Sequence, residues 1–218
     1  MQNAKLLVFD LDGTLVDSLP DLRSSLNRAF AKLGLPPVTA AQVRKAIGDG
    51  AATLVQRLIP PDSSEAFLAQ ALELFREDYD AHACDETFLY PGVAAFLERL
   101  RDQADGPHLA VLTNKPQAPA HTILEHFDLY ARGIEWLVGG DTLATRKPNP
   151  EGLQWIMTQA RVTSAQTLMI GDGPADAGAA RTAGVPFVAL QCGYGESLLV
   201  DSPQGFNYPD FESFAKAW

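Results

Sequence analysis

The chain is poor in cysteine and in positive charge. Its 218 residues include two cysteines, Cys84 and Cys192, which argues against a disulfide framework and predicts a reducing, cytoplasmic location. Lys and Arg total 17 against 27 Asp and Glu, so the formal net charge is −10. This deficit leaves no basic patch to neutralise the phosphates of a nucleic acid. A small anionic ligand would have to be held by local positive charge.

Long apolar runs are also missing. The longest, such as residues 6–9 and 109–112, are far shorter than the roughly 20 residues that a membrane-spanning helix needs. Residues 1–5 lead straight into the first run without the apolar stretch of a signal peptide, so we expect no secretion leader. The length suits one domain, or one domain with an insertion. We expect a protein that binds neither membrane nor nucleic acid. We also expect it to be a monomer or a homodimer.

Five short apolar segments predict a parallel sheet. They lack the polar alternation of a sheet with one wet face, so both of their faces should be covered by helices. Segments with helical spacing lie between them, which predicts an α/β, doubly wound (Rossmann-like) fold. The expected strands are residues 6–9, 109–113, 134–138, 167–170 and 187–190.

The stretch from residue 17 to residue 88 breaks this rhythm. It has no clear strand, but Leu19, Leu22, Leu26 and Phe30 recur at helical spacing. We expect a small helical domain inserted after the first strand, with residues 1–16 and 89–218 forming the α/β core and residues 17–88 the insertion. An insertion at that point would lie over the carboxyl end of the first strand. The alternative is that these helices belong to one larger fold.

The first predicted strand ends in two acids, Asp10 and Asp12, followed by Gly13 and Thr14. Side chains two positions apart on a strand point the same way, so the two carboxylates should lie close together. Such a pair is costly to bury without a cation. The motif therefore predicts a hard metal ion, a covalent nucleophile or both, although a turn rich in Asp and Gly has the same composition.

Polar residues also follow other predicted strands. Because the carboxyl ends of parallel strands meet at one edge of a sheet, these residues should converge near Asp10. Together they supply carboxylates, a hydroxyl and an ammonium, which are the groups needed to handle a phosphoryl group. They are Thr113, Asn114 and Lys115, then Lys147, and finally Asp172 and Asp176.

In this order the motifs resemble those of the haloacid dehalogenase superfamily of phosphohydrolases, and the helical insertion resembles its small helical cap. Segments at residues 47–51, 113–115, 147–150 and 193–195 are most similar to phosphoglycolate phosphatases and close relatives. One position departs from the pattern, since Gly173 follows Asp172 where the family often has serine. The matching residues are, in motif order, residues 10–14, Thr113, Lys147, and Gly171-Asp172 with Asp176.

The resemblance implies a Mg²⁺-dependent phosphatase that acts on a small phosphorylated metabolite through an aspartyl-phosphate, with 2-phosphoglycolate as the leading substrate. Asp10 would be the nucleophile and Asp12 the general acid and base. Implied Mg²⁺ ligands are Asp10, the backbone carbonyl of Asp12, and Asp172, with Asp176 orienting the metal shell or Lys147. The residues implied to hold the phosphoryl oxygens are Thr113, Asn114 and Lys147.

Other readings remain open at this point. Gly48 and Arg44 of the insertion are candidates for contacting the non-phosphate end of the substrate. A sugar-phosphate phosphatase or a phosphomutase would share the same core and differ in its cap. A dehalogenase is disfavoured, because those enzymes lack an acid at the position of Asp12. A non-catalytic protein that binds a phosphorylated ligand would have lost the nucleophile or Lys147, and both are present.

Overall fold

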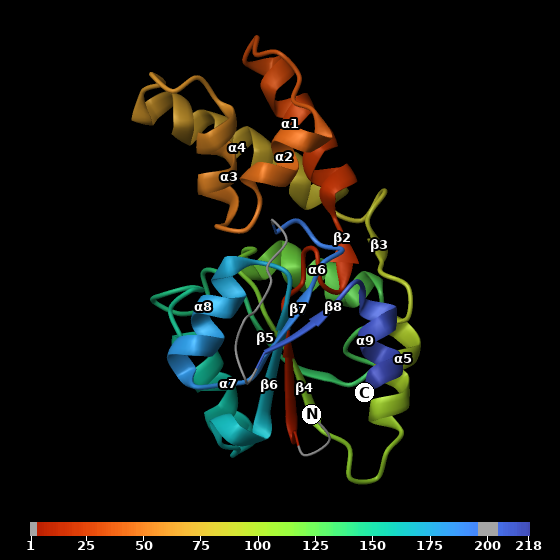
Figure 1. Ribbon diagram of the computed structural model, residues 1–218. Helices are drawn as coiled ribbons and strands as arrows, with labels where there is room; N and C mark the ends of the chain where they lie inside the picture. The colour runs from red at the N-terminus through yellow and green to blue at the C-terminus, as the bar shows by residue number, and fades with distance from the viewer. Residues whose placement is uncertain (1–3, 196–204) are drawn as a thin grey trace.

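The computed structural model describes residues 4–195 and 205–218. A six-stranded sheet in the order β5-β4-β1-β6-β7-β8 forms its centre, and all neighbouring strands are parallel (Figure 1). The predicted α/β class and all five predicted strands are confirmed, with ends that shift by one residue at most, whereas β8 was not predicted. The strands are β1 (Leu6–Phe9), β4 (His108–Leu112), β5 (Ile134–Val138), β6 (Thr167–Gly171), β7 (Phe187–Leu190) and β8 (Gly205–Tyr208).

Helices cover both faces of the sheet, as expected for strands that are apolar throughout. In β1, Leu7 and Phe9 face one hydrophobic cluster, and Leu6 and Val8 face another. The first cluster includes α5, α6 and α9, and the second includes α7 and α8. These helices are α5 (Val93–Arg101), α6 (Gln117–His126), α7 (Glu151–Ala160), α8 (Pro174–Ala183) and α9 (Phe211–Ala217), with a 3₁₀ turn at Ser164–Gln166.

A helical insertion follows β1 and lies beyond the carboxyl ends of the strands (Figure 1). It has its own hydrophobic core, in which Leu26 and Phe30 of α1 pack with Phe75 and Tyr79 of α4. Two of its helices have a side-chain N-cap. One of these is Ser64, whose hydroxyl accepts a hydrogen bond from the Phe67 N–H in the first turn of α4. The four helices are α1 (Leu19–Lys32), α2 (Ala40–Ala46), α3 (Ala51–Leu58) and α4 (Glu65–His82).

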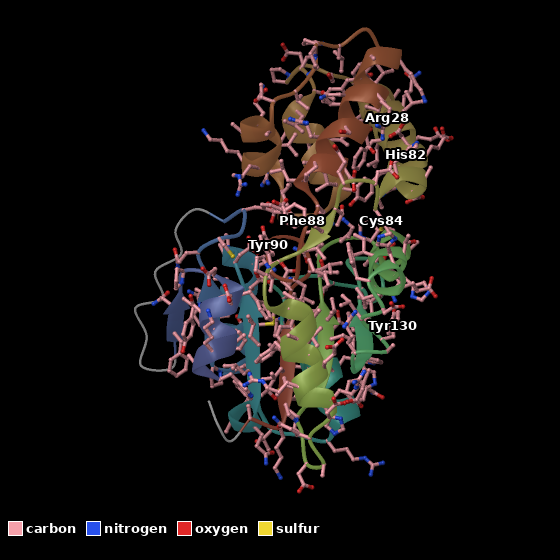
Figure 2. The ribbon with its side chains drawn as sticks, turned by 90° about the vertical axis from the view of Figure 1, so that its right-hand side faces the viewer. Arg28, His82, Cys84, Phe88, Tyr90 and Tyr130 are labelled. Carbon is pink, nitrogen blue, oxygen red and sulfur yellow. The ribbon has the colours of Figure 1, made fainter. Side chains whose placement is uncertain are left out.

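Two short antiparallel strands, β2 (Val16–Asp17) and β3 (Phe88–Leu89), join the insertion to the core. Figure 2 shows Phe88 and Tyr90 at this neck, where their rings meet edge to face at 6.3 Å. The expected division of the chain at residues 16/17 and 88/89 stays a prediction. Among the described residues, no helix is both long and apolar enough to cross a membrane.

Candidate active site

A cavity of about 330 Å³ lies between the carboxyl ends of the strands and the helical insertion. Loops that follow β1, β4 and β6 form its floor, and residues of α3, α4 and the loop before α3 form its roof. Most of the residues predicted from the sequence meet here, because parallel strands present their carboxyl ends at one edge. Those lining the cavity are Asp10, Asp12, Gly48, Thr113, Asn114, Asp172 and Asp176.

Lys147 lies beneath the floor and ties Asp10 to Asp176. Its ammonium is 2.8 Å from Asp10 Oδ1 and 2.6 Å from Asp176 Oδ1, and it also donates to the Leu112 carbonyl at 2.7 Å. Burial alone would lower the pKa of Lys147, but the two carboxylates outweigh it and raise that pKa to about 12. Lys147 is therefore charged at neutral pH and holds Asp10 in place.

Asp172 is held by backbone groups of the 193–195 loop. Its Oδ2 accepts from the Tyr194 N–H at 2.5 Å and the Gly195 N–H at 3.1 Å, and Thr14 Oγ1 approaches its Oδ1 at 3.3 Å. A Cβ placed at Gly193 would lie 2.2 Å from Asp172 Oδ2, so only glycine allows this approach. Burial and Asp176 raise the pKa of Asp172 to about 6, while the two N–H donors oppose the rise.

Three carboxylates converge at one point of the floor. Ligand oxygens of Asp10, Asp172 and Asp176 lie within 4.8 Å of one another. Burial and the carboxylates of Asp176 and Asp172 raise the pKa of Asp10 to about 8, despite the neighbouring Lys147. This excess of buried negative charge fits a hard divalent cation with oxygen ligands, which would offset the repulsion. The carboxylate of Asp12 is not part of this group.

Asp12 has a separate set of partners. Lys115 Nζ donates to its two carboxylate oxygens at 3.0 and 3.2 Å, and Ser18 Oγ donates to Oδ1 at 2.5 Å. The same ammonium donates to Tyr79 Oη at 2.7 Å and lies 4.5 Å from the centre of that ring. The two acids of the first motif are thus each paired with a different buried lysine.

Sequence reasoning assigned no role to Lys115 or Tyr79. Lys115 belongs to the polar segment 113–115 that follows a predicted strand. Tyr79 continues the apolar stripe of α4 one helical turn beyond Phe75. Nothing in the sequence indicated that these two residues meet, because the contact depends on how the insertion packs on the core.

Thr113 and Asn114 occupy the loop after β4. Thr113 Oγ1 accepts from the Lys115 N–H at 3.2 Å. The Asn114 amide donates to the carbonyl of Lys147 in the core and to that of Gly48 in the insertion, each at 2.9 Å. Its Oδ1 is buried and has no hydrogen-bond partner in the part of the chain that the structure describes. Asn114 therefore links the floor of the cavity to its roof.

Arg44 does not line the cavity. Its guanidinium donates to the Gly193 carbonyl at 2.8 Å and lies 5.2 Å from the centre of the Tyr194 ring. The hydroxyl of Tyr194 in turn accepts from the Ser18 and Leu19 N–H groups at the start of α1. Arg44 thus joins the insertion to the loop that holds Asp172, and its role as a substrate ligand stays a prediction.

Fold and cavity together define a capped α/β protein with an acidic site at the carboxyl ends of its parallel strands. The chain belongs to the haloacid dehalogenase-like hydrolase family, whose sequence profile matches residues 7–190.

Proteins similar to this chain carry one recurring name. The phosphoglycolate phosphatase of Pseudomonas putida (strain KT2440) is 39% identical over 203 residues, which cover 91% of this chain and 73% of that protein. That of Rhodospirillum rubrum is 38% identical over 216 residues, covering 96% and 88%. The crystal structure of a predicted phosphoglycolate phosphatase from Haemophilus somnus 129PT matches with a TM-score of 0.91 at 33% identity, over 100% of this chain and 99% of the other.

Proposed function

We propose that this protein is a Mg²⁺-dependent phosphatase of small phosphomonoesters, with 2-phosphoglycolate as the leading substrate. The observation that carries the proposal is the arrangement of Asp10, which lines the cavity beside the carboxylates of Asp172 and Asp176 while Lys147 contacts it from beneath the floor. The named relatives support the substrate class.

In the first step an Asp10 carboxylate oxygen attacks phosphorus and the bond from phosphorus to the leaving oxygen breaks. Asp12 gives its proton to that oxygen, so the product leaves as an alcohol. In the second step water attacks the phosphorus of the aspartyl-phosphate and loses a proton to Asp12. The bond between phosphorus and Asp10 breaks, and inorganic phosphate is released with both aspartates restored.

The other floor residues position the groups that react. Lys147 holds Asp10, and the Thr113 hydroxyl would donate to a phosphoryl oxygen at the end of β4. Asn114 would assist by fixing this loop, because both N–H groups of its amide are donated to the Lys147 and Gly48 carbonyls. Asp10, Asp172 and the backbone carbonyl of Asp12 would hold Mg²⁺, with Asp176 beside them. When bound, the ion supplies positive charge that offsets the repulsion between carboxylate and phosphate.

The helical insertion, residues 17–88, would act as a cap over the core formed by residues 1–16 and 89–218. Its contacts with the loop after β4, through Gly48 and Tyr79, close the cavity from above. The cavity is at the small end of the usual range for ligand sites, roughly 300–1,000 Å³, which favours a small substrate. Opening at the neck would admit substrate, and closing would exclude water.

The test is phosphate release from 2-phosphoglycolate with Mg²⁺, compared between the protein and its Asp10→Asn variant. We expect the variant to lose activity by a factor on the order of 10³ or more, because an amide cannot serve as the nucleophile. Intact mass measurement excludes deamidation back to aspartate. Activity near that of the unaltered protein in an intact Asp10→Asn sample would overturn the covalent mechanism.

A further inference from the structure

Lys115 is the buried cation of the cavity. Its side chain is 4% exposed, and the Asp12 carboxylate that it contacts is 13% exposed. Its ammonium lies 3.0 Å from Asp12 Oδ1 and 2.7 Å from the Tyr79 hydroxyl, so it forms a buried ion pair at the cavity wall.

The ammonium lies at the cavity wall among acceptors that a ligand can join. Its three N–H groups face the two Asp12 carboxylate oxygens, at 3.0 and 3.2 Å, and the Tyr79 hydroxyl at 2.7 Å. Both partners also line the cavity, as Lys115 itself does. A ligand carboxylate would take the N–H of the longest of these contacts, the one to Asp12 Oδ2, next to the place where the leaving oxygen of a substrate would receive its proton.

The other positive charges near the cavity are less suited to bind an anion there. Among the lining residues that the structure describes, Arg76 of α4 carries the second positive charge, and it is exposed, so solvent screens it. Arg44 lies outside the lining and is bonded to the Gly193 carbonyl. Arg146, whose guanidinium lies beside Gly50, is also outside the lining and is exposed. The charge of Lys115 acts in a buried setting, where an ion pair with a ligand is stronger than at the surface.

We propose that Lys115 is the specificity-determining residue of the site and receives a carboxylate that lies one carbon away from the leaving oxygen of the substrate. The proposal rests on the proposed function and extends it, because Lys115 would select phosphorylated 2-hydroxy acids over phosphomonoesters of the same size whose other end is uncharged. In 2-phosphoglycolate the carboxylate and the leaving oxygen are attached to the same carbon. A residue that touches Asp12 is therefore within reach of both ends of such a substrate.

Tyr79 makes this selection depend on the cap. Its hydroxyl holds the ammonium from above, and its ring lies against the same nitrogen. Burial, with a further contribution from Asp12, raises the pKa of Tyr79 to about 12, so it stays a neutral phenol at the pH of the assay. When the cap is away, Lys115 loses one of its two partners and is free to turn from the position in which it meets the carboxylate.

The experiment compares 2-phosphoglycolate with 2-hydroxyethyl phosphate, in which a CH₂OH group replaces the carboxylate. Steady-state kcat and KM are measured with Mg²⁺ for the unaltered protein and for Lys115→Met, Lys115→Arg and Arg44→Met. We expect Lys115→Met to raise KM for 2-phosphoglycolate about 10- to 100-fold more than KM for 2-hydroxyethyl phosphate, since a charge-assisted hydrogen bond is lost. Lys115→Arg should restore much of the selectivity, and Arg44→Met should change both substrates alike.

Two results overturn the proposal. One is equal loss for both substrates in Lys115→Met, which reduces Lys115 to a structural partner of Asp12. The other is loss of selectivity in Arg44→Met, which moves the carboxylate site to the cap arginine. If Lys115→Met does not fold, Tyr79→Phe is tested in its place. We expect this variant to raise KM for 2-phosphoglycolate selectively, and the absence of a selective rise would contradict the proposal. Failure of the phosphatase function itself is seen separately, as absence of Asp10-dependent turnover of both substrates.

Discussion

Two buried lysines lie at the cavity, Lys147 beneath its floor and Lys115 in its wall, and they differ in which part of the molecule supplies their partners. Lys147 contacts Asp10, Asp176 and a carbonyl of β4, all of which belong to the core. Lys115 also comes from the core, but one of its partners, Tyr79, belongs to the helical insertion. The contacts of Lys147 are complete without the helical insertion, whereas those of Lys115 are not. The difference separates the proposed chemistry, which the core fixes, from substrate selection, which requires the cap.

The largest effect is expected for Lys147→Met. The substitution leaves two buried carboxylates, Asp10 and Asp176, facing each other without the cation that now joins them. We expect loss of measurable phosphatase activity and a free energy of unfolding lower by about 3–5 kcal/mol. Urea unfolding without Mg²⁺ measures the stability change. Adding Asp176→Asn should recover part of the lost stability without recovering activity, and a double variant as unstable as Lys147→Met would contradict this account of the floor.

A smaller effect, on the chemical step alone, is expected for Asp12→Asn. Because Asp12 is proposed to protonate the leaving oxygen, the variant should lose kcat on 2-phosphoglycolate by about 10²–10⁴-fold. The loss should be much smaller with p-nitrophenyl phosphate in a pre-steady-state assay of p-nitrophenol release, since that leaving group needs no proton. Equal losses with both substrates would show that Asp12 acts by position and not by proton transfer.

A third effect concerns the pH dependence of stability and the metal. The pKa of Asp10, about 8 in the folded protein, lies above the value of about 4 expected when unfolded, so the folded state binds more protons between these limits. Its contribution to the free energy of unfolding should therefore decline as pH rises from about 4 to about 8. Thermal unfolding in EDTA across this range, with Asp10→Asn as the reference, measures it.

Mg²⁺ should flatten this pH dependence, because the ion stabilises the ionised carboxylates and binds only the folded site. The Asp172→Asn variant serves as the control that should respond least to the ion. A difference in Tm between the protein and Asp10→Asn that is the same at every pH, with or without Mg²⁺, would remove Asp10 from the metal site.

The core was predictable from the sequence because its signals are local. Each predicted strand is a continuous apolar segment whose two faces are both covered, and residues at the ends of such strands must meet at one edge. β8 was missed because it is half-buried at the end of the sheet and includes Gly205 and Asn207, which weaken a strand pattern. α8 begins at Pro174, directly after Gly173, which takes the position before the helix.

The roof was less predictable because its contacts join distant segments. Gly48 lines the cavity, whereas Arg44, four residues earlier, turns to the Gly193 carbonyl. The contact of Lys115 with Tyr79 depends on the packing of α4 against α1 and on the angle at the neck. Neither is encoded in a short motif.

The central claim, that Asp10 carries the phosphoryl group, is tested most directly by the configuration at phosphorus. A substrate made chiral at phosphorus with sulfur and oxygen isotopes is hydrolysed in isotopically labelled water, and the configuration of the released thiophosphate is determined. Each in-line displacement inverts phosphorus, so transfer first to Asp10 and then to water gives overall retention. Retention is the result that the account predicts, and inversion, which indicates direct attack by water, would contradict it.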